Sequence, residues 1–401
     1  LYVFFPLVFG YLRDRRRFIV IGSARPVTPE KRQERAEAVL DALLRLGPTF
    51  IKLGQLLSTR PDILPPEYIA VLSELQDRVP PEPWAAARGV IEAEVGPVSE
   101  RFDSFESDPI SGASLGQVYR AEVDGEEVAV KVRRPRVELI VSVDLTVLGW
   151  VVPVVKWFVG PSRAFSLENV TGEFAETIRE EMDYEREARM LDEIRGNFED
   201  DASVRMPAVV RSHSTERVLT MEYVPGTKIT DVEAIDELGL DRGELAASLQ
   251  RTYLQMVMED GVFHADPHPG NLAVQPDGTL VFYDFGMSGY VDSFIQRKII
   301  AFYVSVANRD IEGILDALIE MGTLRPDADR ETMGRVMELA IEDAQGQDIE
   351  QYRIQQIVQQ VEDTIYEFPF RLPRNLALIL RVATVVEGVC VTLDEEFDFI
   401  A

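Results

Sequence analysis

Apolar residues in the first quarter of the chain recur at intervals of three and four, which predicts helices. The first predicted helix begins at Thr28-Pro29-Glu30, where an N-cap residue, a first-turn proline and an acidic residue stand together, and it ends at Gly47-Pro48. Three more helices are predicted, at 50–59, 67–75 and 84–94. Residues 1–99 are therefore expected to form an N-terminal helical extension.

Beyond residue 100 the pattern changes to short runs in which apolar and polar residues alternate. Gly116–Val123 and Glu127–Val132 flank Asp124-Gly125, a pair typical of a hairpin turn. Two long helices are predicted next, at 137–158 and 166–196, followed by a strand pair at 209–211 and 217–223. Residues 100–224 are thus expected to form a lobe that combines a β-sheet with inserted helices.

After Pro225-Gly226 the pattern is mostly helical. The exception is a predicted hairpin with strands at 271–274 and 279–283, and a further helix is expected to begin near Phe294. Residues 225–401 are therefore expected to form a helical second lobe. With no internal repeat in the sequence, these patterns predict an α+β fold with two lobes and an N-terminal helical extension.

Composition limits the classes of function. The 401 residues carry 69 acidic and 41 basic side chains, a net charge of −28, and 46% are hydrophobic, which is enough for a folded core. The acidic excess argues against a protein that binds nucleic acid by neutralising phosphates. Only six of the basic residues are lysines, and we interpret this as a halophilic composition, since salt near 1 M screens charges beyond about 3 Å. The single Cys390 excludes an internal disulfide and fits a reducing compartment.

No uncharged stretch reaches the roughly 18 residues that a membrane-spanning helix needs. Arg374–Leu393 is expected not to span a bilayer, because Arg381 and Glu387 interrupt it. At the other end, the apolar Leu1–Leu12 runs into the basic segment 13–17. That order is typical of an interfacial segment beside anionic lipid, and equally of a packed terminal helix with a solvated end.

The clearest chemical signal is His-x-Asp-x4-Asn at 264–271, followed by an Asp-Phe-Gly triplet that begins 13 residues after Asn271. A phosphoryl-transfer site needs an aspartate near the attacking oxygen, an asparagine five residues later on a divalent ion, and a second aspartate on that ion. Asp266, Asn271 and Asp284 fit these roles in order, so the sequence predicts Mg²⁺ at Asn271 and Asp284 and a catalytic Asp266.

The histidines of this segment allow a different interpretation, a metal site formed by His264, His268 and Asp266. Zinc sites usually take three or four nitrogen or sulfur ligands. Pro267 and Pro269 would also break a helix presenting such a pair. We therefore expect His264 to be a structural residue that hydrogen-bonds nearby backbone.

Upstream, Val128-Ala129-Val130-Lys131 resembles the kinase strand whose lysine contacts the α and β phosphates of ATP. The preceding loop should be glycine-rich, because glycines let backbone N–H groups approach phosphate. Its candidate residues depart from that pattern, with only two glycines: Ser111, Gly112, Ala113, Ser114 and Gly116. No Ala-Pro-Glu sequence follows Asp284, so the usual platform for a peptide substrate is expected to be missing.

Together these features resemble the UbiB family of atypical protein-kinase-like proteins, also called AarF-type, from about residue 45 to 395. The most specific match is Lys52-Leu53-Gly54-Gln55, which has the Lys-x-Gly-Gln signature of that family. Lys52 and Gln55 are three residues apart and share a helix face. The resemblance implies a kinase-like fold in which the helical extension covers the site and Lys52 points into it and gates substrate entry.

The resemblance also implies roles for acidic residues that lie between Lys131 and the His-x-Asp-x4-Asn segment. Glu181-x-Asp183 is similar to the Glu-x-Asp signature of the family, which implies that it works with Lys52. Glu187 falls where the family places the partner of the strand lysine, Lys131 in this chain. These residues join Asp266 as the expected catalytic and regulatory set.

For the nucleotide, the resemblance implies ATP or ADP together with Mg²⁺. Glu222 and Val224, where the two lobes join, are further candidate nucleotide contacts. UbiB-type proteins carry an alanine-rich loop, from which 111–114 departs by its glycine. We hypothesise that Gly112 eases ATP binding relative to ADP.

The implied function is an ATPase or kinase that supports isoprenoid quinone or prenyl-lipid metabolism. Its expected partners are a nucleotide, a membrane lipid or prenyl precursor, and proteins of a lipid-biosynthesis complex. The expected location is cytoplasmic, at the inner face of the cell membrane. Three alternatives stay open: a small-molecule kinase similar to aminoglycoside and choline phosphotransferases, an orthodox protein kinase, and a nucleotide-sensing scaffold without turnover.

Overall fold

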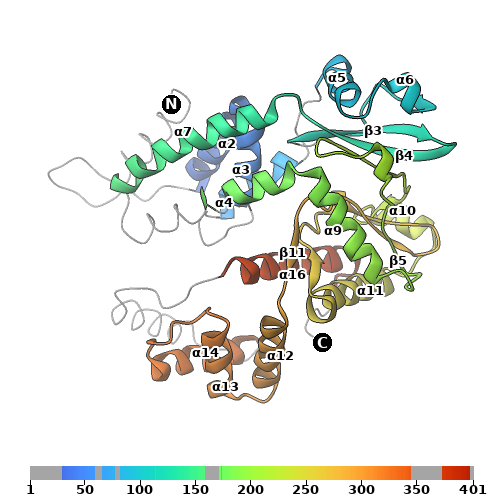
Figure 1. The fold of residues 1–401 in the computed structure, drawn as a ribbon. Coiled ribbons are helices and arrows are strands. Elements are labelled where there is room, and N and C mark those ends of the chain that lie inside the picture. Colours follow the sequence, from blue (N-terminus) through green and yellow to red (C-terminus); the bar gives the residue numbers. More distant parts are fainter. Residues whose placement is uncertain are drawn as a thin grey trace. The chain divides into compact units, whose positions relative to one another are not determined.

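The computed structural model describes residues 29–58, 66–76, 82–112, 114–158, 171–172, 174–344 and 373–397 (Figure 1). The chain divides into two compact units. Unit 1 comprises Leu1–Asp192 and Pro207–Val224, and unit 2 comprises Glu193–Met206 and Pro225–Ala401. The helical extension and the sheet-containing lobe that the sequence predicts thus share unit 1. Thr28, the apolar segment 1–12 and the basic segment 13–17 lie outside the described residues.

Unit 1 begins with helices α2 (Pro29–Leu46), α3 (Pro48–Ser58) and α4 (Pro66–Leu72) and the 3-10 turn η1 (Ser73–Gln76). Their apolar faces form one core cluster that includes Leu43, Phe50, Leu72 and Leu75. Each helix begins with a proline, whose missing N–H is not needed in a first turn. The predicted helices of this region are confirmed.

Gly54 lies where α3 approaches a neighbouring turn closely. A Cβ atom at this position would clash with Cδ1 of Leu75 and would lie 2.7 Å from Cδ1 of Leu43. Leu75 is 0% exposed and Leu43 2% exposed, so neither side chain has open space to move into. Hence glycine is required at this position for packing.

We expect Gly54→Ala to lower the free energy of unfolding by about 1–3 kcal/mol, the usual cost of overpacking a core. Urea denaturation followed by circular dichroism measures this change. Gly89→Ala is the matched control, because a Cβ atom at Gly89, in the helix at 84–94, meets nothing within 4 Å. Equal stabilities of the two variants would contradict the packing argument.

The sheet of unit 1 contains β1 (Ser104–Phe105), β2 (Ser111–Gly112), β3 (Gly116–Val123), β4 (Glu126–Arg133) and β6 (Val218–Glu222). Its order is β1-β3-β4-β6, and β2 pairs with β3, all antiparallel. Helices α5 (Trp84–Glu94) and α6 (Val98–Arg101) lie beside this sheet (Figure 1). Ile91 of α5 and Tyr119 and Val130 of the sheet, each 0% exposed, form the centre of the core between helix and sheet.

Helix α7 (Val137–Phe158) matches the predicted helix, but the next one does not. Residues 174–181 are helical, the helix is interrupted at Met182 and Asp183, and α9 (Tyr184–Asn197) follows. The prediction of one continuous helix at 166–196 was therefore wrong. The side chain of Asp183 accepts a hydrogen bond from the backbone N–H of Arg186, as an N-cap does, and so begins a new helix.

The predicted strand at 209–211 was also wrong. Val209 forms only an isolated bridge with Met221, and Arg211–His213 is a 3-10 turn, η2. The N–H of Val210 donates to the carbonyl of Thr220 (2.8 Å), but the N–H of Thr220 donates to the Oγ of Ser214, which donates to the carbonyl of Val210. A side chain thus replaces one backbone hydrogen bond of a regular strand pair.

Unit 2 has two small sheets. The first, in the order β5-β10-β9-β7, consists of β5 (Val204–Arg205), β10 (Leu280–Phe282), β9 (Leu272–Val274) and β7 (Thr227–Lys228). The second pairs β8 (Val262–His264) with β11 (Ser288–Tyr290). The predicted hairpin at 271–283 is confirmed as β9 and β10, with Leu280 opposite Val274.

Unit 2 also contains several helices. They are α10 (Val232–Glu237), α11 (Arg242–Gln255) with its π-helical continuation η3 (Met256–Asp260), α12 (Ser293–Ala307), α13 (Ile311–Glu320), α14 (Arg330–Ala344) and α16 (Arg374–Leu393). The short 3-10 turn η4 (Pro269–Asn271) precedes β9. Phe263, Phe282 and Phe285 are 0–1% exposed and lie in the core of the unit.

Among the described helices, α16 is long and apolar enough over Asn375–Leu393 to cross a membrane, judged by length and composition alone. Arg381 and Glu387 leave this segment strongly apolar in composition, and the expectation that it does not span a bilayer stays a prediction. A core helix of a soluble protein passes the same test. Part of α16 is core, since Cys390 is 0% exposed and its thiol donates to the carbonyl of Ala246 in α11 (3.4 Å).

Candidate functional site

The strand lysine of unit 1 forms a buried ion pair. Lys131, on the central strand β4, places Nζ 2.8 and 2.9 Å from the two carboxylate oxygens of Glu187 on α9. Lys131 is 8% exposed and Glu187 1% exposed. The ammonium also lies 5.3 Å from the ring centre of Tyr184. The structure thus brings together the two residues that the family resemblance paired, and their catalytic role stays a prediction.

A second lysine pair stands nearby in unit 1. Nζ of Lys52 on α3 lies 2.7 Å from Oε1 of Glu181, the last helical residue before the Met182–Asp183 break. Gln55 has a different partner from Lys52, because its Nε2 donates to the backbone carbonyl of Leu75 (3.1 Å). In the Lys-x-Gly-Gln motif, Gly54 and Gln55 therefore hold α3 against the η1 turn, and Lys52 forms the ion pair.

The candidate nucleotide loop is the tip of the β2–β3 hairpin, where Ser111 is opposite Val118 and Gly112 is opposite Gln117. Ser111 and Gly112 are exposed and Ser114 is buried, and Ala113 lies outside the described residues. Gly116 has no space for a side chain, since a Cβ atom there would clash with the hydroxyl of Tyr184. The same tyrosine therefore contacts both the end of this loop and Lys131.

Two further candidates lie at the end of the sheet. Glu222 is opposite Val128 on β4, and its backbone N–H donates to the carbonyl of Ala208 (2.8 Å). Val224 is 3% exposed and is the last residue of unit 1 before Pro225. Glu222 thus has a role in strand pairing, and its predicted contact with a nucleotide stays a prediction.

In unit 2, Asp266 and Asn271 belong to one short loop between β8 and β9. Nδ2 of Asn271 donates to the backbone carbonyl of Asp266 (3.1 Å) and to its carboxylate oxygen Oδ2 (3.3 Å). The ring Nδ1 of His268 accepts the backbone N–H of Gly270 (3.1 Å), which closes the η4 turn. The prolines of this loop thus separate His264 from His268 instead of presenting both on a helix.

Asp284 follows strand β10 with a positive φ of 53°, a conformation that L residues adopt rarely. Its Oδ1 accepts the backbone N–H of Gly286 (3.2 Å). The N–H of Tyr283 donates to the carbonyl of Asn271 (2.9 Å), so Asn271 and Asp284 lie at the same end of the β9–β10 hairpin.

The ring of His264 hydrogen-bonds the backbone at Asp284 and so stabilises its conformation. It is 0% exposed, and its Nε2 lies 3.1 Å from the carbonyl of Tyr283 and 3.0 Å from that of Asp284. Carbonyls only accept, so Nε2 carries the proton and Nδ1 accepts from the hydroxyl of Tyr253 (3.0 Å). The expectation of a structural histidine bonded to nearby backbone is confirmed. Within the described part of the chain, no group of three or more His, Cys, Asp or Glu residues is placed to hold a metal.

Burial lowers the pKa of His264 because it disfavours the charged ring, although the carboxylate of Asp266 opposes this effect. The unfolded chain therefore takes up a proton below about pH 6.5 that the folded chain does not. We expect the free energy of unfolding to fall as the pH drops below this value, by up to about 1.4 kcal/mol per pH unit. Thermal unfolding between pH 5 and 8 measures the slope.

A comparison of variants isolates the contribution of His264, one of three histidines in the chain. His264→Gln should lower stability at every pH and flatten the slope below about pH 6.5. A slope as steep in His264→Gln as in the unmodified protein would contradict the assignment.

Sequence reasoning missed one residue of the candidate site, Arg381 of α16. Its Nη2 lies 2.9 Å from Oδ1 of Asp266, and the side chains are 16% and 25% exposed. Nη1 of Arg381 also lies 3.9 Å from the sulfur of Met287. The two oxygens of the Asp266 carboxylate are thus engaged by Arg381 and Asn271. A lone arginine in an apolar helix was the available signal, but it was interpreted only as an interruption.

The donor set fits Mg²⁺. Asn271 uses its amide N–H group on Asp266, which leaves its carbonyl oxygen oriented as an acceptor. That oxygen and the Asp284 carboxylate stand at one end of the β9–β10 hairpin. Two oxygen ligands from the protein match the way Mg²⁺ is usually bound, with substrate phosphates and water completing six positions.

Comparisons with known proteins identify the family of the chain. The model of the ABC1 atypical kinase-like domain matches residues 74–318. The chain is 37% identical over 375 residues to a Synechocystis protein named as uncharacterized, covering 93% of this chain and 64% of the relative. It is 36% identical over 379 residues to the chloroplastic protein Activity of BC1 Complex Kinase 7 of Arabidopsis thaliana, covering 92% and 54%. The chain thus spans about half to two thirds of these relatives.

A solved structure gives the same result for the fold. Rv3197 of Mycobacterium tuberculosis, solved as a complex with erythromycin, matches with a TM-score of 0.58 and 24% identity over 92% of this chain and 94% of that chain. At this identity the likeness concerns the fold alone, which is kinase-like. The matched domain, together with the relatives, shows that the chain belongs to the ABC1 family of atypical kinase-like proteins, the UbiB-type family that its motifs resemble.

Proposed function

We propose that this protein is a Mg²⁺-dependent, ATP-binding kinase or ATPase that supports isoprenoid quinone or prenyl-lipid metabolism at a membrane. The observation that carries the proposal is the hydrogen-bonded arrangement of Asp266, Asn271 and Asp284. Holding these polar side chains in fixed positions costs conformational entropy. Phosphoryl transfer would explain why they are held, because positioning of the reacting groups supplies most of its catalysis.

In this mechanism each unit has its own task. In unit 1, Lys131, fixed by Glu187, contacts the α and β phosphates of the nucleotide. In unit 2, Asn271 and Asp284 would hold Mg²⁺, which supplies charge neutralisation of the phosphates when bound. Asp266 orients the attacking water or hydroxyl, and Arg381 fixes the direction of its carboxylate.

The acceptor is proposed to be water or a small lipid molecule and not a peptide. Only six residues separate Gly286 from α12, and three of them form β11, which pairs with β8. Asp292 then caps α12 by accepting the N–H groups of Phe294 and Ile295. This short connection supports the expectation that the peptide-binding segment of protein kinases is missing.

One observation favours a second candidate, a nucleotide-sensing scaffold without turnover. The Arg381 guanidinium is bound to Asp266, the residue that should contact the acceptor. A hydroxyl acceptor must therefore share this carboxylate with Arg381 and Asn271. If the ion pair persists in the nucleotide-bound protein, binding without phosphate release is the expected behaviour.

The test is phosphate release from Mg-ATP by the purified protein in molar KCl, with and without vesicles that contain a prenylated quinone. Turnover that the vesicles raise supports a lipid-linked ATPase. Turnover that the vesicles leave unchanged would refute the proposed link to a membrane but would support the proposed enzymatic activity. ATP binding without phosphate under both conditions would favour the scaffold.

A further inference from the structure

Tyr184, the first residue of α9, lies between two parts of unit 1 that are expected to bind phosphate. Its ring centre is 5.3 Å from Nζ of Lys131, and its hydroxyl occupies the space that a side chain at Gly116 would need. Tyr184 is 1% exposed, so both contacts are made inside the core. One side chain thus touches the strand lysine and the end of the candidate nucleotide loop.

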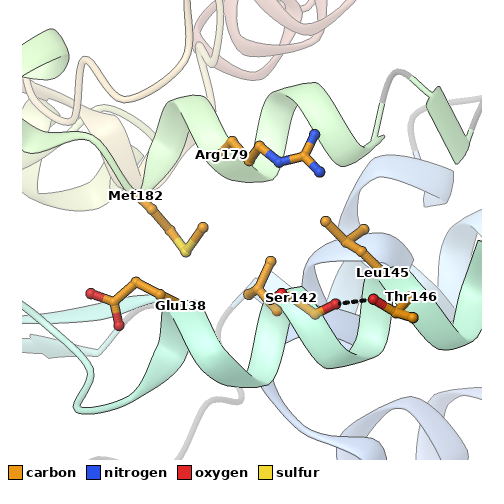
Figure 2. A pocket seen from close by; sticks show the side chains of 7 residues that line it. Glu138, Ser142, Leu145, Thr146, Arg179 and Met182 are labelled. Carbon is orange, nitrogen blue, oxygen red and sulfur yellow. Dashed lines mark hydrogen bonds between the residues drawn. The ribbon is translucent and has the colours of Figure 1, made fainter.

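Two backbone interactions fix where α9 begins and hence where Tyr184 lies. The N–H of Tyr184, in the first turn of the helix, donates to the carbonyl of Glu216 (3.2 Å). Just before it, the carbonyl of Met182 accepts a hydrogen bond from the guanidinium of Arg133, which also pairs with Glu138. Figure 2 shows Met182 and Glu138 on facing helices. Arg133 therefore ties the helix break to both α7 and strand β4.

The register of the sheet places these contacts side by side. Lys131 and Arg133 are two residues apart on β4, so their side chains leave the same face of the sheet, and both meet the segment 182–187. Gly116 on β3 is the direct partner of Arg133. A tyrosine at the start of α9 can therefore reach Gly116 with its hydroxyl and Lys131 with its ring.

The end of the loop is held on both sides of Gly116. The carbonyl of Leu115 accepts the N–H of Arg134 (2.8 Å). The side chain of Gln117, 2% exposed, accepts the backbone N–H of Glu82 and donates to the backbone carbonyl of the same residue. Because both neighbours of Gly116 are held, the space between Gly116 and the tyrosine hydroxyl is fixed as well.

The contact between Tyr184 and Lys131 is electrostatic. Tyr184 and Glu187 are three residues apart on α9, so they share a helix face and both reach the ammonium of Lys131. The face of an aromatic ring attracts a cation, most strongly where water is excluded. A second carboxylate at this place would also attract the ammonium, but it would repel phosphate. A neutral ring restrains the lysine without that repulsion.

We propose that Tyr184 is a positioning residue for nucleotide binding. Its ring restrains the ammonium of Lys131, and its hydroxyl fixes the spacing between α9 and the loop end at Gly116. Loop and lysine are thereby held in one arrangement before a nucleotide arrives, so less conformational freedom is lost when phosphates bind. The ligands that gain from this are nucleoside di- and triphosphates and not nucleosides. This inference rests on the nucleotide binding proposed above.

The experiment measures the affinities of the full chain for Mg-ATP and for adenosine by isothermal titration calorimetry. Tyr184→Leu removes the ring. We expect it to weaken ATP binding about tenfold, the scale of one desolvated cation–π contact, and to leave adenosine binding within about twofold. Tyr184→Phe keeps the ring and loses only the hydroxyl, so its ATP affinity should lie between those of the unmodified chain and Tyr184→Leu. Equal losses of ATP and adenosine binding in Tyr184→Leu would indicate a structural role alone and would overturn the proposal.

A second set of variants tests the hydroxyl. Gly116→Ala places a Cβ atom against that hydroxyl and should weaken ATP binding. Gly116→Ala/Tyr184→Phe should bind ATP more tightly than Gly116→Ala, because the nearest remaining atom is then the carbonyl oxygen of Val132 at 3.0 Å. Gly196→Ala, on α9, is the matched control, because a Cβ atom there meets nothing within 4 Å. A double variant that binds ATP no better than Gly116→Ala would overturn the role of the hydroxyl.

The outcomes distinguish this inference from the proposed function. If the unmodified chain binds no ATP, the proposed function and the inference are both refuted. If the unmodified chain and Tyr184→Leu bind ATP equally, only the inference is overturned. Thermal unfolding of each variant without nucleotide shows that it is folded, and if Tyr184→Leu does not fold, Tyr184→Phe and the two Gly116→Ala variants decide the question.

Discussion

Asp284→Asn is expected to reduce the rate of phosphate release from Mg-ATP by about 100-fold or more. Rate losses of this size are typical when an enzyme loses one electrostatic contact to the transition state. Asparagine has the same shape and retains an oxygen that can accept the N–H of Gly286. The substitution therefore removes the negative charge and little else. Without that charge, Asn271 alone would have to hold the cation. The measurement is the initial rate at saturating ATP, together with Mg²⁺ dependence.

Asp277→Asn is the matched control for Asp284→Asn. Asp277 lies in the turn of the same β9–β10 hairpin, at the opposite end, where its side chain accepts the N–H of Thr279 (3.1 Å). We expect this variant to turn over ATP like the unmodified protein. If Asp284→Asn retained full turnover with an unchanged Mg²⁺ dependence, the proposed role of Asp284 would be wrong.

The largest effect on stability is expected for Glu187→Ala. It leaves the ammonium of Lys131 in a position that is 8% exposed, without its carboxylate partner. Breaking a buried ion pair from one side typically costs about 3–5 kcal/mol. A unit of roughly 200 residues loses about 2–4 °C of Tm per kcal/mol. Differential scanning calorimetry should therefore show a clear drop in the Tm of the transition.

Two comparisons identify the cause of this drop. The double variant Lys131→Met/Glu187→Leu should recover most of the lost Tm, because apolar pairs often replace buried ion pairs at no cost. Glu185→Gln, on the same helix, breaks a pair with Arg189 in which both side chains are more than half exposed, and should change stability by at most about 1 kcal/mol. A double variant as unstable as Glu187→Ala would mean that the charge left on Lys131 is not the cause.

Much of the fold was predictable because its signals are local. A few neighbouring residues determine the Asp124-Gly125 turn between β3 and β4. The same holds for the starts of α2 and α3, each of which begins at a proline. The break at Met182 was not predictable in this way. The helical periodicity continues through it, and the residue that engages the Met182 carbonyl, Arg133, is 49 positions earlier in the chain.

In the candidate site, too, some residues could be predicted from the local sequence and others could not. Asp266, Asn271 and Asp284 stand within one short segment, so their spacing alone indicates joint chemistry. Arg381 is 115 positions from Asp266, and nothing in the local pattern of α16 links the two. In the same way, the reason for a glycine at 54 lies in a contact with Leu75, which periodicity cannot show.

The distance along the chain between Asp266 and Arg381 also sets an order of assembly during protein synthesis. A ribosome adds about 5–20 residues per second, so the 115 positions between these residues correspond to roughly 6–23 s of translation. Throughout that interval the nascent chain carries the Asp266 loop without the arginine that fixes it. The candidate site of unit 2 is thus completed only once α16 has been made, late in synthesis.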